Sequence, residues 1–524
     1  MADQPNTSFR PSMNWVHTWA GVVLGALLFI IFWMGTMSVF DREIDRWMQP
    51  QTRLASPAAP TTSYDSLLDI ARAAEPGKQL TKLTIGTANT RAPFATIHAT
   101  YADKTRRTLV VDTITNRLIP EPASLGGTGF LYPMHINLIL PGVWGWWIVM
   151  FAAIAMLLLL VTGVIIHHKI FADFFTFRPE KKLRRSSLDL HNLSGTIFLP
   201  FHFLITFSGL MVFSGWYTSI PWYVAPASVG EPVAALINEA DQYGHFRREA
   251  AGRPGGGVAL APLVQRAEAI WRVRHGTATP ADYIDIDHIG DAQGYMAVRG
   301  NAPRRMVSDV DEIVFDLATG RIVKDSTPTT TRTVQKWLEG FHLVRFDHWL
   351  IRWFYFIGGL AGCLMIATGF VFWSVSRRKR DAQTQPLKVR FVEALTVAAV
   401  SGVILATCAY FVVNRMIPEG ASPGGFPRFV IEVLTFFGAW LATAVHAGVR
   451  QASAWKDQAW VIAGLSVAAI LLNWLTTGHH PIAAINRDLW AIVGMDSMLL
   501  LNAVVAIYAA RRLGQSTLTV GDAP

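Results

Sequence analysis

Long apolar segments recur along the 524-residue chain, and each is long enough to cross a lipid bilayer. Because a bilayer core offers the backbone no hydrogen-bond partners, such segments must fold as α-helices. Eight spans are predicted, at about residues 15–40, 143–167, 188–217, 350–375, 391–413, 429–449, 460–475 and 489–510. With 51% hydrophobic and only 16% charged residues, the chain is too apolar for a soluble protein of this length. We therefore expect an α-helical polytopic membrane protein.

The basic residues cluster beside these apolar segments and predict the orientation of the chain. Five lysines and arginines lie in the connection 177–187, and four consecutive ones, 377–380, follow the fourth span. Because cytoplasmic connections carry an excess of Lys and Arg, we place both clusters in the cytoplasm, with both termini on that side of the membrane. This bias accounts for the net charge of +9. We therefore expect the lipid bilayer as a partner and no nucleic acid.

Two polar segments, 51–132 and 219–339, interrupt the apolar pattern and are predicted to lie on the side of the membrane opposite the cytoplasm. Each contains a run of helical periodicity followed by alternating, β-rich runs, which is typical of a small α+β module. The predicted domains are the first span with a short cytoplasmic tail (1–50), the first module (51–132), the second and third spans with a basic loop (133–218), the second module (219–339), the fourth span (340–380) and a C-terminal bundle of four spans (381–524).

The first half of the chain carries an internal duplication. His17-x-x-x-Gly21 at the start of the first span is repeated as His191-x-x-x-Gly195 at the start of the third. Three further matches follow in order: Val110-x-Asp112-x-x-Thr115-x-Arg117 with Val314-x-Asp316-x-x-Thr319-x-Arg321, His135 with His342, and Thr162-Gly163 with Thr368-Gly369. Their offsets are 204, 207 and 206 residues. This agreement predicts two repeats of helix, module and helix, and hence a pseudo-twofold core of four helices. The last four spans show no such repeat.

Histidines in and beside the predicted spans are the candidate functional residues. A titratable side chain is costly in hydrocarbon, so an intramembrane histidine indicates a function. The stretch 188–211 contains His191 and His202, eleven residues apart, and a straight helix would present both imidazoles on one side at two depths. The predicted topology places His17, His167 and His191 at the cytoplasmic ends of spans, His135 and His342 at the outer ends, and His202 deeper in the bundle.

Two histidines from facing helices at each leaflet would hold a b-type haem through both axial positions. We therefore predict two haems: an inner one bound by His17 and His191, with His167 as the alternative, and an outer one bound by His135 and His342, with His202 able to replace either or to serve a third centre. Small residues would let a flat macrocycle approach the helix backbone, as at Gly21, Gly25 and Gly195.

The cysteines, glycine clusters and basic residues indicate which cofactors and electron donors fit this sequence. Cys363 and Cys408 both lie in apolar runs, which excludes a disulfide framework, a cysteine metal site and c-type haem attachment. The glycine clusters at 126–129 and 252–257 do not lie between a strand and a helix, so neither is a dinucleotide fingerprint. We expect a quinol or a separate cytoplasmic reductase as electron donor. Candidates for pairing with haem propionates are Arg10, Lys169 and Arg352.

Several longer motifs carry a resemblance to a known family. They are HTWAGVVLG and VFDREIDRWMQP in the first span, GVIIHHKIFADFFTFRPEK after the second, LDLHNLSGTIFLPFHFLITFSGL in the third, VFDLATGRIV in the second module, and FHLVRFDHWLIRWFYFIGGLAGCLMIATGFVFW through the fourth span. Together they cover about residues 10–380. In wording and order they resemble the PepSY-associated transmembrane proteins, a family that includes bacterial inner-membrane ferric-siderophore reductases.

The resemblance implies membrane helices with periplasmic PepSY modules, b-type haem held by helix histidines, and an oxidoreductase that passes electrons to a ferric siderophore or other periplasmic ferric chelate for iron acquisition. Reduction loosens such a chelate because its oxygen ligands prefer the harder ferric ion. Carried over residue by residue, the family's histidines fall on His17, His135, His167, His191, His202 and His342. The last four spans have no counterpart in this resemblance.

Two alternatives from other classes remain open from the sequence. One is a haem-free transporter or permease, in which His202 and its neighbours relay protons. The other is a membrane anchor whose PepSY modules regulate a periplasmic peptidase.

Overall fold

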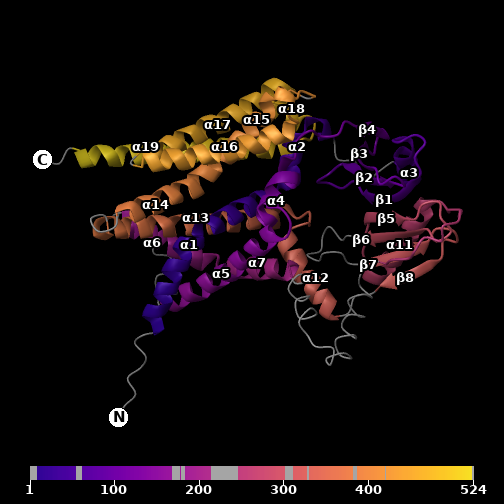
Figure 1. Cartoon of the computed structure of the whole chain (residues 1–524), viewed down its shortest axis with the longest axis horizontal. Coiled ribbons are helices and arrows are strands. Elements are labelled where there is room, and N and C mark those ends of the chain that lie inside the picture. The colour runs from indigo at the N-terminus through magenta and orange to yellow at the C-terminus, as the bar shows by residue number, and fades with distance from the viewer. Residues whose placement is uncertain are drawn as a thin grey trace, which may run out of the picture. The chain divides into compact units, whose positions relative to one another are not determined.

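A computed structural model of the chain describes residues 9–54, 62–167, 178, 183–213, 246–300, 311–326, 330–381, 386–418, 420–451 and 453–521 (Figure 1). The chain divides into two compact units. The helical unit comprises Met1–Arg53, Pro122–Leu210 and Leu350–Pro524, and the sheet unit comprises Leu54–Glu121 and Met211–Trp349. Each unit is described by itself.

The helical unit contains the membrane spans. Seven described helices are long and apolar enough to cross a bilayer, and the bent pair α6 and α7, counted as one span, makes an eighth. The predicted polytopic membrane protein is thus confirmed. The spans are α1 (Phe9–Ser38), α5 (Trp144–Ile166), α6 (Leu183–Ile197) with α7 (Leu199–Val212), α13 (Trp349–Asp381), α14 (Pro386–Val397) continued by α15 (Val403–Met416), α16 (Arg428–Val449), α17 (Ala454–Thr477) and α19 (Trp490–Gly521).

The third span is broken between α6 and α7. The two helices are bent by 64° relative to each other. Pro200, the second residue of α7, has no N–H, so the carbonyl of Thr196 lacks its helical donor and the helix cannot continue straight. The prediction that one straight helix presents His191 and His202 on the same side is therefore wrong. The two imidazoles belong to different helices with different directions.

The last four spans pack against the first half of the chain. Their shared core contains Met34 of α1, Trp47 of α2 (Asp41–Met48), Phe130 of the turn η2 (Gly127–Leu131), Tyr410 of α15 and Phe436 of α16, all fully buried. Figure 1 shows α15, α16, α17 and α19 grouped together. Short helices complete this unit: α4 (Tyr132–Asn137), α18 (Pro481–Ile485) and the single turns η1 (Pro50–Thr52), η4 (Ala398–Gly402) and η5 (Pro423–Gly425).

Buried arginines bind the carbonyl end of α2. Arg53 donates from Nε to the carbonyl of Arg46 at 2.9 Å, and its NH2 group donates to the carbonyl of Trp47. Arg415 of α15 donates to the carbonyl of Met48. The last carbonyls of a helix have no partner within it, so these guanidinium groups satisfy them. The cap also fixes a C-terminal helix to the segment that follows the first span.

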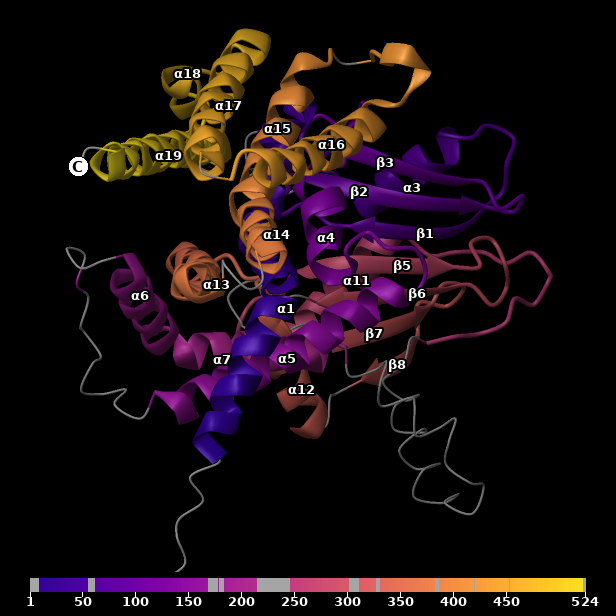
Figure 2. The same ribbon diagram turned by 60° about the vertical axis from the view of Figure 1, so that its left-hand side comes forward.

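The sheet unit contains one antiparallel sheet of eight strands in the order β4-β3-β2-β1-β5-β6-β7-β8. The strands are β1 (Leu80–Gly86), β2 (Phe94–Tyr101), β3 (Arg106–Asp112), β4 (Arg117–Ile119), β5 (Ala281–Asp287), β6 (Tyr295–Gly300), β7 (Asp311–Asp316) and β8 (Ile322–Ser326). At its centre β1 pairs with β5, with Ile85 opposite Ile284 (Figure 2). The two modules predicted from the sequence therefore share one sheet.

Two helices pack on one face of this sheet. They are α3 (Tyr64–Ala73) and α11 (Leu260–His275), and the unit also contains α12 (Thr330–Leu343). Leu67 of α3 and Trp271 of α11 are buried against apolar side chains of the strands, such as Leu83 and Ile284. The alternation of buried and exposed residues along β1, β2 and β5 matches a sheet with one covered face.

The hairpins of the sheet bear out the duplication. The turn β3–β4 is held by Thr115, whose hydroxyl donates to Asp112 at 2.7 Å, and the turn β7–β8 by Thr319, whose hydroxyl donates to Asp316 at 2.9 Å. Each turn ends in a residue with positive φ, Asn116 at 56° and Gly320 at 65°. In each turn the aspartate carboxylate also accepts the backbone N–H of the threonine. The repeated Asp-x-x-Thr thus encodes the same turn twice, because Asp and Thr favour turns held by their own side chains.

Candidate cofactor pocket

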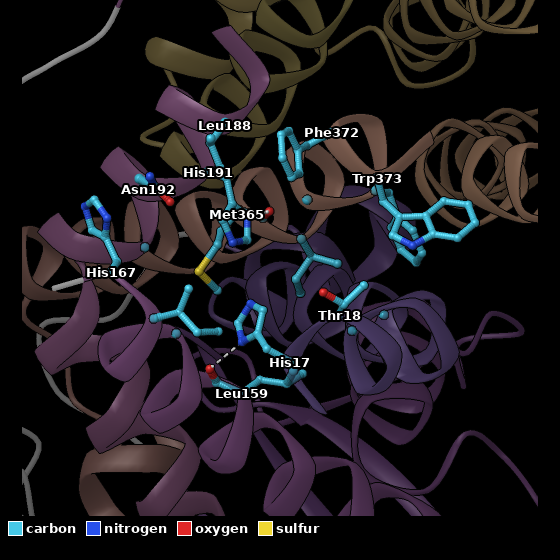
Figure 3. A pocket seen from close by; sticks show the side chains of 18 of the residues that line it. His17, Thr18, Leu159, His167, Leu188, His191, Asn192, Met365, Phe372 and Trp373 are labelled. Carbon is cyan, nitrogen blue, oxygen red and sulfur yellow. Dashed lines mark hydrogen bonds between the residues drawn. The ribbon is translucent and has the colours of Figure 1, made fainter. Parts of the chain in front are cut away.

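A cavity of about 540 Å³ lies in the helical unit between α1, α5, α6 and α13 (Figure 3). Its lining includes apolar side chains, among them Leu28, Met156, Leu160 and Ile366. It also includes polar and basic side chains, namely those of Asn14, Asn192, Arg184, Ser376 and Arg377. His17 and His191 line the cavity and enter it from α1 and α6.

The imidazole ring of His17 on α1 lies next to that of His191 on α6, with ring centroids 6.3 Å apart and ring planes at 79° to each other. His17 Nδ1 lies 3.0 Å from the carbonyl oxygen of Leu159, and His191 Nδ1 lies 2.7 Å from that of Met365. A carbonyl only accepts, so each Nδ1 carries the proton and each Nε2 presents a lone pair. In Figure 3 the hydrogen bond of His17 lies on the side of the ring away from His191.

This spacing fits a metal held between two imidazoles. With metal–nitrogen bonds of about 2 Å and ring centres about 1.1 Å behind each nitrogen, the two ring centres would be about 6 Å apart. Among the described residues no group of three or more His, Cys, Asp or Glu side chains could hold a metal ion. Two imidazoles are, however, the complete protein donor set for a haem, since the macrocycle supplies the other four ligands.

Glycines shape both the cavity and the seats of the two imidazoles. A Cβ at Gly21, one turn after His17, would meet only Leu159 at 3.9 Å, so the helix leaves open space there. A Cβ at Gly163 would lie 3.3 Å from His17 Cε1, and one at Gly369 would lie 3.1 Å from His191 Nδ1. The glycine of each Thr-Gly pair thus lets an imidazole rest against the next span.

The two halves of the pocket follow the duplication seen in the sequence. Leu159 and Met365, the acceptors of the two histidine N–H groups, stand at equivalent positions of α5 and α13, three residues before Thr162 and Thr368. Both threonine hydroxyls bond back to carbonyls of their own helix. The halves differ in one contact: Thr162 Oγ1 also lies 3.0 Å from His17 Nδ1.

The other predicted histidines are placed differently. His167 lines the same cavity at the end of α5, so the structure brings together His17, His191 and His167. His135 of α4 bonds through Nδ1 to the carbonyl of Ile31 at 2.9 Å. His342 lies in α12 of the sheet unit. Because His135 and His342 belong to different units, their pairing stays a prediction.

His202 bonds to a backbone carbonyl through Nε2, whereas His17 and His191 do so through Nδ1. Its Nε2 bonds to the carbonyl of Gly358 at 3.0 Å, whereas its Nδ1 is buried without a partner among the described residues. Its ring is enclosed by Phe32, Phe198 and Phe201. The nitrogen that His17 and His191 leave free is therefore engaged in His202.

Of the predicted propionate partners, only Arg10 and Arg352 are described, since Lys169 lies outside the described residues. Arg10 bonds to the carbonyl of Ile166. Arg352 is 1% exposed and forms a bidentate ion pair with Glu43. The prediction that Arg352 pairs with a haem propionate is therefore wrong.

The basic residues that do line the cavity, Arg184 and Arg377, were missed. A signal was present for Arg184, because Arg184-x₆-His191 repeats the spacing of Arg10-x₆-His17.

These features define a multi-pass helical membrane protein whose duplicated core encloses a pocket with two facing imidazoles. The sequence pattern of the family described as PepSY-associated TM region matches residues 14–375, and the chain belongs to this family. The uncharacterized protein PA4219 of Pseudomonas aeruginosa is 24% identical to it over 364 residues, which cover 65% of this chain and 85% of that protein.

Proposed function

We propose that the protein is a transmembrane electron-transfer protein with b-type haem that reduces ferric chelates, of the ferric-siderophore reductase type. The observation that carries this proposal is the pair His17 and His191, with ring centroids 6.3 Å apart and both Nε2 atoms free of the backbone. A bound haem would supply a one-electron redox centre within the span of the membrane.

The chain's own residues hold the imidazoles in a fixed state. The carbonyls of Leu159 and Met365 fix both tautomers and ring orientations, and such partners raise the basicity of a ligand imidazole. The apolar lining residues Leu28, Met156 and Ile366 lower the polarity around the imidazoles. Low polarity around a redox centre is one of the means by which a protein tunes its potential.

The orientation predicted from the basic clusters determines on which side of the membrane the electron donor and the electron acceptor lie. In that orientation His17 and His191 lie near the cytoplasmic ends of their spans, where a quinol or a separate reductase delivers electrons. The sheet unit is then periplasmic, on the side of the ferric chelate. His135 and His342 have equivalent places in the duplicated sequence, and a second haem bound by them stays a prediction from the sequence.

The visible spectrum of the purified full-length protein tests this proposal. We expect a reduced-minus-oxidised spectrum of b-type haem that is lost or strongly altered in His191→Ala and unchanged in the control His98→Ala, whose histidine is exposed on β2. The reduced protein should be reoxidised by a ferric chelate. A colourless protein from cells with ample haem would overturn the haem assignment and leave the transporter or anchor alternatives. A haem protein that ferric chelates do not reoxidise would overturn only the reductase assignment.

A further inference from the structure

The two facing histidines of the pocket differ in the acceptors of their N–H groups. His17 Nδ1 lies 3.0 Å from the carbonyl oxygen of Leu159 and 3.0 Å from the hydroxyl oxygen of Thr162. Among the described residues, His191 Nδ1 has one hydrogen-bond partner, the carbonyl oxygen of Met365 at 2.7 Å. The N–H of His17 is therefore shared between two acceptors, whereas that of His191 donates to one.

The hydroxyl of Thr162 is arranged to accept this N–H. Its own proton goes to the backbone of α5, because Oγ1 lies 2.8 Å from the carbonyl oxygen of Leu158 and 3.1 Å from that of Leu159. A hydroxyl has one proton and two lone pairs, and a carbonyl oxygen only accepts. Thr162 is 1% exposed. Its remaining lone pairs are thus buried beside the Nδ1–H group of His17.

Thr368, the equivalent threonine of α13, makes the same backbone bonds without a bond to an imidazole. Its hydroxyl donates to the carbonyl of Leu364 at 2.7 Å and lies 3.1 Å from that of Met365. Between the described side chains of Thr368 and His191 there is no hydrogen bond. An effect that a threonine exerts through the acceptor carbonyl is therefore common to both halves, and only Thr162 accepts the imidazole N–H directly.

The positions of the two rings over their glycines differ in the same sense. A Cβ at Gly163 would lie 3.3 Å from Cε1 of His17 and 3.8 Å from its Nδ1. A Cβ at Gly369 would lie 3.1 Å from Nδ1 of His191 and 3.2 Å from its Cε1. The Nδ1 atom of His17 is thus farther from its glycine than that of His191.

We propose that Thr162 is a positioning residue for His17 and makes the two imidazoles unequal ligands. This step rests on the proposed function, because both imidazoles are taken to bind the iron of one haem. Two acceptors restrict rotation of an imidazole ring more than one acceptor does. An acceptor at the N–H of a ligand imidazole also raises the basicity of that ligand, and a more basic ligand favours ferric over ferrous iron.

The midpoint potential of the haem in the full-length protein tests this role. Thr162→Val keeps the shape of the side chain and removes an acceptor from His17, so we expect a higher potential than in wild type. Thr162→Ser keeps a hydroxyl and should restore most of the wild-type value.

Thr368→Val is the matched control. It removes a hydroxyl that bonds to the helix backbone in the same way but does not contact His191. The potential of this variant should stay close to that of wild type. Equal shifts in the two valine variants, or no shift in Thr162→Val, would overturn the proposal.

A second measurement does not depend on haem. In apoprotein that contains histidine labelled with a nitrogen isotope, NMR reports the Nδ1 signal of His17, which is assigned by its loss in His17→Ala. This signal should move in Thr162→Val and stay in place in Thr368→Val. A colourless protein would refute the proposed function, and this signal would then decide alone whether Thr162 holds His17. An unmoved signal in Thr162→Val refutes the contact.

Discussion

The indole N–H of Trp47 donates to Asp496 Oδ1 at 2.8 Å, between residues 449 positions apart in the sequence. The second carboxylate oxygen accepts the indole N–H of Trp474 at 2.7 Å. Trp47 belongs to α2, directly after the first span, whereas Trp474 and Asp496 belong to α17 and α19. One buried carboxylate therefore ties the C-terminal helices to the half of the chain that carries the pocket, and the four last spans are part of one fold.

Replacement of this carboxylate should destabilise the whole helical unit. Asp496→Ala leaves two indole N–H groups without an acceptor, at a cost of about 2–4 kcal/mol. Asp496→Asn keeps one carbonyl oxygen and should cost less. Thermal unfolding in detergent measures both, with Ser497→Ala as the control, because Ser497 is exposed and bonds only to its own helix. Equal melting of Asp496→Ala and the control would show that this tie does not contribute to stability.

The ion pair of Glu43 and Arg352 should behave as a buried structural pair. The two bonds measure 2.9 and 2.7 Å, and the guanidinium also lies 4.6 Å from the ring centre of Phe40. Arg352→Met removes both guanidinium hydrogen bonds from the buried carboxylate of Glu43, at a cost of about 3–5 kcal/mol. The double variant with Glu43→Gln should recover part of this loss, which a double-mutant cycle of unfolding measures. Additive losses would contradict a direct pairing.

The parts of the site that could be predicted from the sequence are those fixed by repeated local signals. His17 and His191 were found because each opens a long apolar segment in the same way, and the duplication then placed them on facing helices. The Thr-Gly pairs are visible in the sequence as repeats. Their role follows only from the structure, where the imidazoles of His17 and His191 rest against Gly163 and Gly369.

The direction of α7, the pairing of β1 with β5 and the place of Arg184 depend on tertiary contacts, which local sequence patterns do not specify. The bend at Pro200 has a local signal, but its consequence for His202 follows only from the direction of α7. The pairing of β1 with β5 joins strands about 200 residues apart, and alternation along a strand does not name its neighbour. Arg184 resembles every other basic residue at the end of a span, until its contacts with Ser376 and Phe372 place it at the pocket.

The stability of the helical unit should depend on pH through Asp45, which lies outside the spans. Its Oδ1 accepts the backbone N–H groups of Gly127 and Thr128 at 2.7 and 3.1 Å. Burial, followed by the nearby charge of Asp41, raises the pKa of Asp45 from 3.8 to about 7 and outweighs these bonds. The folded state thus holds a proton that the unfolded state releases.

With a raised pKa in the folded state, this stabilisation is complete below about pH 4 and is lost as the pH rises through about 7. The slope approaches about 1.4 kcal/mol per pH unit within that window. Asp45→Asn mimics the protonated carboxyl and should remove this part of the dependence, so that its advantage over wild type grows from pH 5 to pH 8. Parallel pH profiles of melting temperature for the two proteins would count against it. Asp69→Asn on the exposed face of α3 serves as the control.

We expect the open space beside Gly21 to be needed for binding of the ligand and not for packing of the helices. Gly21→Leu fills the cavity one turn from His17, and a leucine also raises helix propensity by up to about 1 kcal/mol relative to glycine. We therefore expect an apoprotein at least as stable as wild type that no longer binds haem, measured by unfolding and by visible titration. Gly438→Leu is the matched control, because a Cβ there has no neighbour within 4 Å, and it should gain the same helical stability while keeping haem. Full haem content in Gly21→Leu would mean that the macrocycle does not lie against α1.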